Sequence, residues 1–457
     1  MFENQNVLII GAGRQGLALA RYLASQGAHV TLNDRRNDSA LQSARNALAD
    51  LPIRWVSGGH PLSLLDACDL VCPSGGVPLT LPLVQEAIRR GIPLSNDSQI
   101  FLQAAPCRVI GITGSAGKTT TTTLTGRIAQ AGWKQGRVWV GGNIGNPLIA
   151  DVDAMQAEDL AVMELSSFQL EIMRHSPQVA AVLNITPNHL DRHGTMQAYT
   201  AAKAHILRHQ TPQDTAVLNR EEPGAWGLAE LVCGRLVTFG VGKPPEGSLA
   251  SWLTPKGWLA FQGADGSQKR LLPRQVIQLR GEHNLRNCLA AAAIALSAGL
   301  PAEAVRQGIE GFSGVPHRLE LVRRHRGVAW YNDSIATAPE RAMAAIRSFE
   351  EPIVLLAGGR DKNLPWEDFA ALVRQRVDHV ITFGEAADLI ADAIGEGAPR
   401  PYTLHRCATL EEAVQQAAAV AEAGDVVLLS PGGTSFDAFR DFAERGEKFR
   451  AWVQALP

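Results

Sequence analysis

Short apolar runs alternate along this chain with segments of helical pattern. The first run, "VLII" at 7–10, precedes a helical segment at about 14–26, and "HVTLND" at 29–34 follows that segment. Buried strands that alternate in this way with helices are typical of parallel sheets with crossover connections. The pattern therefore predicts an α/β protein whose sheets are mostly parallel.

The same alternation continues to the C-terminus, with one change in the middle. Further strands are expected at 70–75, 92–97, 109–114, 160–167, 179–186, 215–219, 327–333, 352–359, 379–384 and 425–433. A polar, turn-rich stretch near 243–275 indicates short antiparallel strands instead. An alanine-rich helix is expected at about 283–299, where a glycine ends it.

The length of 457 residues is too great for one core and predicts three domains. The stretch "SGVPHR" at 313–318 has the composition of a linker. We therefore expect domains at 1–98, 99–315 and 316–457.

Composition excludes several classes of protein. Apolar residues make up 46% and charged residues 19%, as in soluble globular proteins, and the net charge of −2 offers no basic surface for nucleic acid or an anionic membrane. The six cysteines are scattered, which favours buried thiols in a reducing cytoplasm. No apolar run reaches 18 residues and no signal peptide is recognisable, so we expect a cytoplasmic protein.

A glycine-rich turn follows the first predicted strand. Gly11, Gly13 and Gly16 have the spacing of a dinucleotide fingerprint, and Asp34 stands near the end of the next strand. Glycines there let the backbone approach phosphate oxygens at a helix N-terminus. The turn predicts binding of a phosphate or nucleotide, although a tight strand–helix turn alone would also need glycine.

A second glycine-rich turn, "GITGSAGKTT" at 111–120, resembles a phosphate-binding loop. Gly117, Lys118 and Thr119 match the end of the general pattern, but its first glycine is displaced because Ile112 stands there. In such a loop, backbone N–H groups and the lysine bind nucleotide phosphates. The Thr119 hydroxyl is a candidate Mg²⁺ ligand.

Polar residues at the ends of later strands extend this chemistry. Glu164 is placed to hold a second Mg²⁺ or its water, and His189 fits a role in Mg²⁺ or phosphate binding better than in zinc binding, since no cysteines lie near it. Considered without the other motifs, Asn143 would be a β-turn residue, Ser166 a helix cap and Lys203 a solvent-exposed surface lysine. In the C-terminal third, candidates follow strands at sheet ends, where α/β proteins bind ligands.

The motifs together resemble those of the Mur ligase family. They are T-G-S-A-G-K-T (113–119), G-G-N-I-G (141–145), E-L-S-S-F-Q-L-E (164–171), N-I-T-P-N-H-L-D-R-H (184–193), A-A-K (201–203), G-x-H-N-x-x-N (281–287), P-H-R-x-E (316–320) and N-D-S-x-A-T (332–337). The resemblance covers essentially the whole chain, and the displaced glycine is this family's own loop variant. It implies a Rossmann-like N-terminal domain, a central P-loop ATPase-like domain with a mostly parallel sheet, and a Rossmann-like C-terminal domain.

The resemblance implies an ATP-dependent ligation with two Mg²⁺ sites. ATP would phosphorylate the terminal carboxylate of UDP-N-acetylmuramoyl-L-alanine, and the amine of D-glutamate would displace phosphate from the acyl phosphate. The enzyme would act as a monomer on these small molecules in cytoplasmic peptidoglycan synthesis, without nucleic acid or membrane partners.

Family residues carry over by motif. Catalytic and metal residues would be Lys118, Thr119, Glu164, His189 and a carbamylated Lys203. ATP would contact Gly114, Ser115, Ala116, Gly117, Lys118, Thr119, Thr120, Asn287, Arg318 and Asp333. The UDP-sugar would contact Gly13, Arg14, Gln15, Asp34, Arg35, Arg36, Ser74, Asn143, Ser166 and Gln169. Glutamate would contact Thr337, Lys362, Ser435, Phe436 and Phe442.

Three departures from the family pattern concern amino-acid specificity and sugar contacts. Ile335 stands where the family has lysine, Phe436 where leucine is frequent, and the first-domain turn reads P-S-G-G at 73–76. Ligation of L-glutamate therefore remains an alternative. A folylpolyglutamate-type ligase, which shares the central ATP domain, is a second alternative, disfavoured because that family lacks a leading UDP-binding domain. A plain P-loop ATPase or an NAD-dependent dehydrogenase leaves part of the motif set unexplained.

Overall fold

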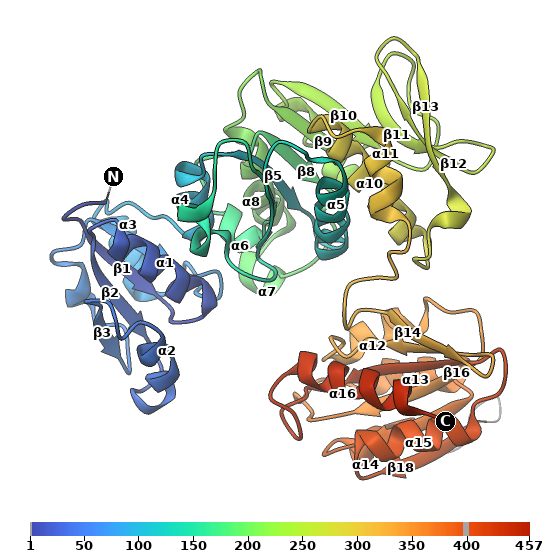
Figure 1. Ribbon diagram of the computed structural model, residues 1–457. Coiled ribbons are helices and arrows are strands. Elements are labelled where there is room, and N and C mark those ends of the chain that lie inside the picture. The colour runs from blue at the N-terminus through green and yellow to red at the C-terminus, as the bar shows by residue number, and fades with distance from the viewer. Residues whose placement is uncertain (1, 396–401) are drawn as a thin grey trace. The chain divides into compact units, whose positions relative to one another are not determined.

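The computed structural model describes residues 2–395 and 402–457 (Figure 1). Contacts divide the chain into two compact units. The first runs to Gln278 and includes Glu282–Phe312, and the second comprises Leu279–Gly281 and the residues from Ser313 onward. Each unit is described by itself.

The first unit begins with a parallel four-stranded sheet of order β3-β2-β1-β4. Its strands are β1 (Asn6–Ile10), β2 (His29–Asp34), β3 (Arg54–Ser57) and β4 (Leu70–Pro73). The helices here are α1 (Arg14–Ser25), α2 (Gln42–Ala47), α3 (Pro82–Arg89) and α4 (Asp97–Ala104). The glycine-rich turn thus lies between β1 and α1, as the sequence predicts.

The prediction of a strand at 92–97 is wrong. Only an isolated parallel bridge joins Leu94 to Val71, and α4 begins at Asp97. The reason is a helix cap: the side-chain oxygen of Asn96 accepts a hydrogen bond from the Gln99 N–H (2.8 Å).

A nine-stranded sheet forms the rest of the first unit, in the order β13-β12-β11-β10-β9-β8-β5-β7-β6. Its strands are β5 (Arg108–Thr113), β6 (Val138–Gly142), β7 (Leu160–Glu164), β8 (Val179–Val182), β9 (Thr215–Asn219), β10 (Arg235–Phe239), β11 (Leu249–Leu253), β12 (Trp258–Gln262) and β13 (Gln268–Pro273). The pairs β11–β12 and β12–β13 are antiparallel, which confirms the prediction for the turn-rich stretch. All other neighbours are parallel.

Helices cover this sheet and bury its central strands. They are α5 (Lys118–Gly132), α6 (Ser167–Leu170), α7 (Leu190–His193), α8 (Met196–Arg208), α9 (Pro223–Trp226), α10 (Glu282–Ser297) and α11 (Ala302–Ile309). Helix α5, which follows β5 in the chain, packs against α10 and α11, and Figure 1 shows α5 beside α10. Every residue of β7 and β8 is buried, as expected for parallel strands covered on both faces.

The second unit contains a six-stranded sheet of order β14-β15-β19-β16-β17-β18, parallel except for β14–β15. The strands are β14 (Glu320–His325), β15 (Val328–Asn332), β16 (Ile353–Gly358), β17 (His379–Phe383), β18 (Thr403–Cys407) and β19 (Val426–Gly432). The helices are α12 (Pro339–Ile346), α13 (Glu367–Arg376), α14 (Ala387–Ile394), α15 (Leu410–Val420) and α16 (Phe442–Ala455).

Alternation along the strands divides this unit into two apolar layers. Leu355 of β16 packs in one core with residues of α12, α13 and α14, whereas Val354 and Leu356 pack in the other with α15 and α16. The three sheets and their covering helices confirm the α/β fold with mostly parallel strands. The carboxyl ends of the strands carry most of the predicted site residues.

Candidate active site

The phosphate-loop candidate connects the end of β5 to the first turn of α5. Gly117 caps α5 with φ of +80°, and a Cβ there would lie 2.4 Å from Asn287 Oδ1 of α10. Only glycine fits this position, and the close approach brings Asn287 against the loop. Ile112, which replaces the glycine of the general pattern, is a fully buried residue of β5. The strand therefore extends past that position before the loop begins.

Two lysines meet at one carbonyl of this loop. Lys118 Nζ donates to Gly114 O (2.8 Å) and Lys203 Nζ donates to the same oxygen (2.9 Å). Lys203 is buried on α8 and also reaches Thr113 Oγ1 (3.4 Å), so the solvated-surface interpretation of this residue is wrong. Burial lowers the pKa of the Lys203 amine well below its usual value, the charge of Lys118 lowers it further, and Glu164 opposes both.

Glu164 ends β7 in a buried position beside these lysines. Its Oε1 accepts a hydrogen bond from Asn143 Nδ2 (2.9 Å), while Oε2 is buried and finds no hydrogen-bond partner in the part of the chain that the structure describes. A buried carboxylate oxygen without a donor is costly unless a cation or water binds it. The orphaned oxygen therefore fits an Mg²⁺ ligand.

The phosphate loop is held by two residues that the motif analysis did not assign. Asn184, after β8, exchanges two hydrogen bonds with the backbone of Ala116 (2.8 and 3.1 Å). The Tyr199 hydroxyl lies 2.9 Å from Ser115 Oγ, and the Tyr199 ring faces Lys203 Nζ at 4.8 Å. Asn184 lies within the N-I-T-P-N-H motif, and Tyr199 precedes Lys203 by one helical turn. These two positions in the sequence could have indicated that Asn184 and Tyr199 support the loop.

His189 lies in a cluster of rings before and within α7. It is exposed, with a left-handed φ of +53°, and its ring meets the edge of Phe168 at 5.1 Å. On the same Phe168 ring, His193 stacks at 5.2 Å and the Arg192 guanidinium lies 4.6 Å from the centroid. The other predicted metal residue, Thr119, is half-buried in the first turn of α5.

A pocket of about 340 Å³ lies between the N-terminal glycine turn and the loop after β6. Its lining is Gly11, Gly13, Arg14, Gln15, Ser74, Gly76, Val77, Gly142, Asn143, Gly145 and Pro147. Five predicted UDP-sugar residues, Gly13, Arg14, Gln15, Ser74 and Asn143, are thus brought together. The turn needs its third glycine, because a Cβ on Gly16 would lie 1.9 Å from Gly11 O.

The remaining predicted UDP-sugar residues lie outside the pocket lining. Asp34 is buried, accepts from Ala12 N (2.8 Å) and pairs with Arg36 (2.8 Å), which keeps the Asp34 pKa well below its usual range. Arg35 is exposed. Ser166 and Gln169 form a capping box at the start of α6, and Gln169 Nε2 donates to Ser98 Oγ (2.7 Å). None of these five residues lines the pocket.

In the second unit, Asp333 follows β15 and is buried. It accepts hydrogen bonds from Ser430 Oγ (2.8 Å) and Leu319 N (3.2 Å), and burial raises its pKa to about 7. The exposed Arg318 is close enough that its charge opposes this rise. The structure thus brings Arg318 and Asp333 together.

Two of the predicted glutamate residues are in contact. Lys362 Nζ donates to Thr337 Oγ1 (3.4 Å), and paired backbone hydrogen bonds between Arg360 and Thr434 join the loop of Lys362 to the loop of Ser435. Ser435 is buried, whereas the aromatic side chains of Phe436 and Phe442 are 62% and 36% exposed. Phe436 follows Ser435 directly in the chain, whereas the Phe442 ring meets the His317 ring edge-on at 6.1 Å.

Arg445 of α16 is fully buried, and the sequence analysis did not select it. Its guanidinium donates four hydrogen bonds, to Ser334 Oγ (3.0 Å), Ser334 O (2.9 Å), Thr434 O (3.0 Å) and Gly433 O (3.1 Å). It therefore ties the loop after β15 to the loop after β19. The only sequence signal was a basic residue at a position where α16 faces the sheet.

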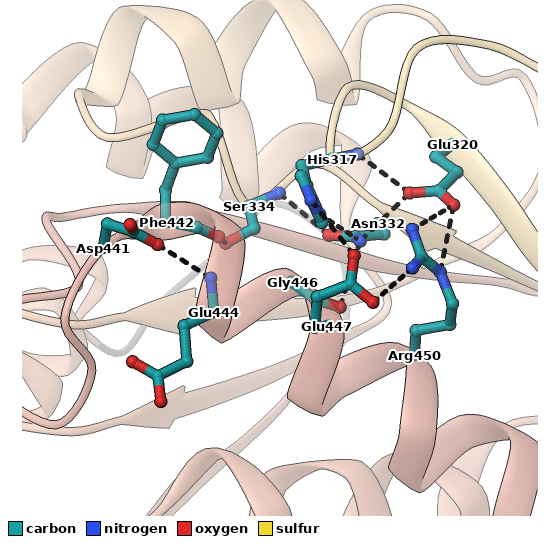
Figure 2. Close-up of polar contacts among 10 residues, drawn as sticks. All are labelled: His317, Glu320, Asn332, Ser334, Asp441, Phe442, Glu444, Gly446, Glu447 and Arg450. Atoms are coloured by element: carbon teal, nitrogen blue, oxygen red, sulfur yellow. Dashed lines mark hydrogen bonds and ion pairs between the residues drawn. The ribbon is translucent and has the colours of Figure 1, made fainter. Parts of the chain in front are cut away.

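A second polar network fixes the turn that carries Arg318 (Figure 2). His317 adopts a left-handed φ of +65°, and its N–H donates to Glu320 Oε2 (2.8 Å). Asn332 Nδ2 reaches Glu320 Oε2 (3.2 Å) and Gly446 O (3.2 Å), while Arg450 donates to Glu320 Oε1 (2.6 Å). The end of β15 and helix α16 are thereby joined to the turn.

Residues 2–395 and 402–457 contain neither a membrane-spanning helix nor a cluster of side chains arranged to share a metal ion. No helix there is long and apolar enough to cross a membrane. No group of three or more histidine, cysteine or acidic side chains is placed there to share a metal ion. A metal in this site would thus depend on Glu164, on hydroxyl or imidazole ligands, and on water or phosphate oxygens, which suits Mg²⁺.

Comparison with known proteins gives a consistent result over all three sheets. The chain matches the Mur ligase MurD-like N-terminal domain over residues 5–96, the Mur ligase middle domain over 112–295 and the Mur ligase glutamate ligase domain over 317–433. It is 42% identical over 452 residues to a UDP-N-acetylmuramoylalanine–D-glutamate ligase of Symbiobacterium thermophilum, covering 99% of this chain and 98% of the relative. The enzyme of that name from Geobacter metallireducens is 41% identical over 457 residues, with coverage of 99% and 98%.

Solved structures agree on the fold. UDP-N-acetylmuramate-alanine ligase of Thermotoga maritima aligns with a TM-score of 0.58 at 21% identity, covering 99% of this chain and 100% of that one. A pseudomurein peptide ligase type C from Methanothermus fervidus aligns at 0.55 and 18% identity, covering 99% of each chain. The domain matches and full-length identities together show that the chain belongs to the Mur ligase family.

Proposed function

We propose that this chain is the ATP-dependent ligase that joins D-glutamate to UDP-N-acetylmuramoyl-L-alanine in peptidoglycan precursor synthesis. The names of relatives that are 42% and 41% identical over the whole chain support the reaction. Within the molecule, the observation that carries it is the meeting of Lys118 and Lys203 at the Gly114 carbonyl of a phosphate loop.

The reaction needs an activated carboxylate. A carboxylate oxygen of the UDP-sugar attacks the terminal phosphorus of ATP, ADP leaves, and the acyl phosphate forms. The amine of glutamate then attacks the carbonyl carbon, and phosphate leaves from the tetrahedral intermediate. Lys118 and N–H groups of the loop at 114–120, other than those of Ser115 and Ala116 that donate to Asn184, would hold the phosphates and offset their charge. Asn287, Arg318 and Asp333 are assigned to the rest of ATP.

Two Mg²⁺ ions complete the proposed site. Glu164 would offer its unpartnered Oε2, Thr119 its hydroxyl and His189 its imidazole. When bound, Mg²⁺ neutralises phosphate charge. The buried, weakly basic Lys203 amine fits carbamylation, because only the neutral amine attacks CO₂, and the resulting carbamate would supply further oxygens for a metal.

The substrates are assigned to separate regions. The 340 Å³ pocket suits the UDP part of the sugar substrate, with Arg14 and the N-terminus of α1 facing the diphosphate. Asp34, Arg35, Arg36, Ser166 and Gln169 are proposed contacts outside the pocket lining. Thr337, Lys362, Ser435, Phe436 and Phe442 are assigned to glutamate. We assign domains to 1–98, 99–315 and 316–457, and propose a cytoplasmic monomer.

The deciding experiment measures phosphate release from ATP in the presence of UDP-N-acetylmuramoyl-L-alanine. Release that depends on D-glutamate is expected. Release that depends on L-glutamate would retain the mechanism but overturn the stereochemical assignment, with Ile335 and Phe436 as the residues to exchange first. Release without any amino acid would indicate an ATPase and would overturn the ligase assignment.

A further inference from the structure

Arg192 connects two regions that the proposed function treats separately. It lies on α7, three residues after His189, and its Nη1 donates to Gly76 O at 3.4 Å. Gly76 belongs to the loop after β4 and lines the pocket assigned to the UDP-sugar. The guanidinium therefore lies at the edge of this pocket, and it contacts the same Phe168 ring as His189.

The Arg192 side chain is exposed but oriented. Its guanidinium lies 4.6 Å from the centroid of the Phe168 ring, a cation–π contact. Phe168 is itself fixed by the parallel His193 ring at 5.2 Å, and His193 Nε2 lies 3.0 Å from Ser167 Oγ. The aromatic face thus holds the guanidinium in position while leaving the N–H groups at its edge able to donate.

The hydrogen bond from Arg192 to the Gly76 carbonyl is weak, so an anionic oxygen could replace that carbonyl as the acceptor. A distance of 3.4 Å to a neutral carbonyl lies beyond the usual range, whereas an arginine binds an anionic oxygen through short, often paired, charge-assisted bonds. Among the residues that line the pocket, Arg14 alone carries a positive charge. A second cation at the edge of the pocket would add to the charge that Arg14 offers a diphosphate there.

We propose that Arg192 is a further substrate-binding residue, which exchanges the Gly76 carbonyl for an anionic oxygen of the UDP-sugar while Phe168 orients its guanidinium. This inference rests on the proposed function. The anion is the diphosphate or the terminal carboxylate of the same substrate. Since Gly76 lines the pocket, the diphosphate is the expected source.

The test compares Arg192→Gln and Arg192→Lys with the control Arg208→Gln, which removes an exposed arginine of α8 in the same unit. Calorimetry gives the Kd for UDP, UDP-N-acetylglucosamine and UDP-N-acetylmuramoyl-L-alanine, and phosphate release gives KM and kcat. We expect Arg192→Gln to raise the Kd of all three ligands about 10- to 100-fold, as for loss of a charged hydrogen bond. Arg192→Lys should be intermediate, because it keeps the charge and loses the fork.

The ligand series separates the two anions. Weakened binding of UDP and UDP-N-acetylglucosamine supports the diphosphate, and weakened binding of the complete substrate alone supports the carboxylate. Unchanged Kd and KM in an active Arg192→Gln enzyme would overturn the inference, as would a fall in Tm and kcat with unchanged Kd. If the parent enzyme releases no phosphate with any glutamate, the proposed function fails, whereas UDP binding still tests Arg192.

Discussion

Lys203 in the first unit and Arg445 in the second are both fully buried basic side chains, but their surroundings differ. Lys203 donates to one carbonyl at 2.9 Å and to one hydroxyl at 3.4 Å, with a second lysine at the same carbonyl. Arg445 donates four hydrogen bonds of 2.9–3.1 Å to oxygens of two loops. Both side chains are almost fully removed from solvent.

The number of acceptors and the neighbouring charges act on the pKa of each group. Burial lowers the pKa of Arg445 only to about 10, so the guanidinium stays charged at neutral pH and holds its loops. Burial and the charge of Lys118 lower the pKa of Lys203 well below its usual value, and Glu164 opposes both effects. A buried cation with several acceptors stabilises structure, while one with few acceptors becomes a reactive group.

The largest expected effect comes from removing the reactive amine. Lys203→Ala should lower the rate of D-glutamate-dependent phosphate release by about 10³-fold, because the site loses the group that would become a carbamate. Added short carboxylic acids should restore part of that rate by placing a carboxylate in the space left by the side chain. Full activity of Lys203→Ala without an added acid would show that Lys203 is not a reactive group, and it would then not differ from Arg445 in this respect.

Opposite effects on stability form the second test. Arg445→Met leaves four oxygens without their donor and should lower the free energy of unfolding by about 3–5 kcal/mol, measured by urea titration. Lys203→Met replaces a poorly paired amine by an apolar chain of similar length and should raise that energy by about 1–2 kcal/mol.

Arg440→Met is the matched control, because this side chain is 83% exposed and makes a long ion pair of 3.7 Å with Asp441. Its free energy of unfolding should change by less than about 0.5 kcal/mol. If Lys203→Met and Arg445→Met destabilised the protein equally, the number of acceptors would not explain their difference.

The sequence predicted the two lysine sites unequally. Lys118 was recognised from glycine spacing and strand–loop–helix order, which are local properties, and the structure places its amine at the loop. Lys203, by composition alone, looked like a solvated residue, since its burial arises from β5, β7 and α8 packing together. Only the family resemblance assigned it a role.

Arg445 and the strand at 92–97 show the same limit. The four oxygens that accept from Arg445 belong to Ser334, Gly433 and Thr434, which lie 111, 12 and 11 residues before it, so no pattern within α16 itself indicates them. The apolar positions at 92–97 suggested a strand, but the Asn96 cap started a helix there. The alternation of apolar runs predicted the parallel sheets correctly, because a strand that is buried on both faces is a continuous apolar run in the sequence.

A buried acid extends the comparison to pH. Burial raises the pKa of Asp333 to about 7, above the value of about 3.9 for an unfolded chain, so the folded state holds a proton between these values. Its contribution to stability should therefore fall as the pH rises from 4 to 7, by up to about 1.4 kcal/mol per pH unit. Asp333→Asn should remove this slope in urea titrations, and the exposed control Asp368→Asn should retain it.

The smallest expected effect separates the loop's support from the chemistry of Lys203. Tyr199→Phe removes the hydroxyl that lies 2.9 Å from Ser115 Oγ but keeps the ring 4.8 Å from Lys203 Nζ. One neutral hydrogen bond is worth about 1 kcal/mol, so the KM for ATP should rise about fivefold while kcat stays within about twofold. Tyr199→Leu, which also removes the ring, should lower kcat further. Equal losses of kcat in both variants would mean that the hydroxyl acts on the reactive amine, and the contrast between a supported loop and a poorly paired lysine would then have to be abandoned.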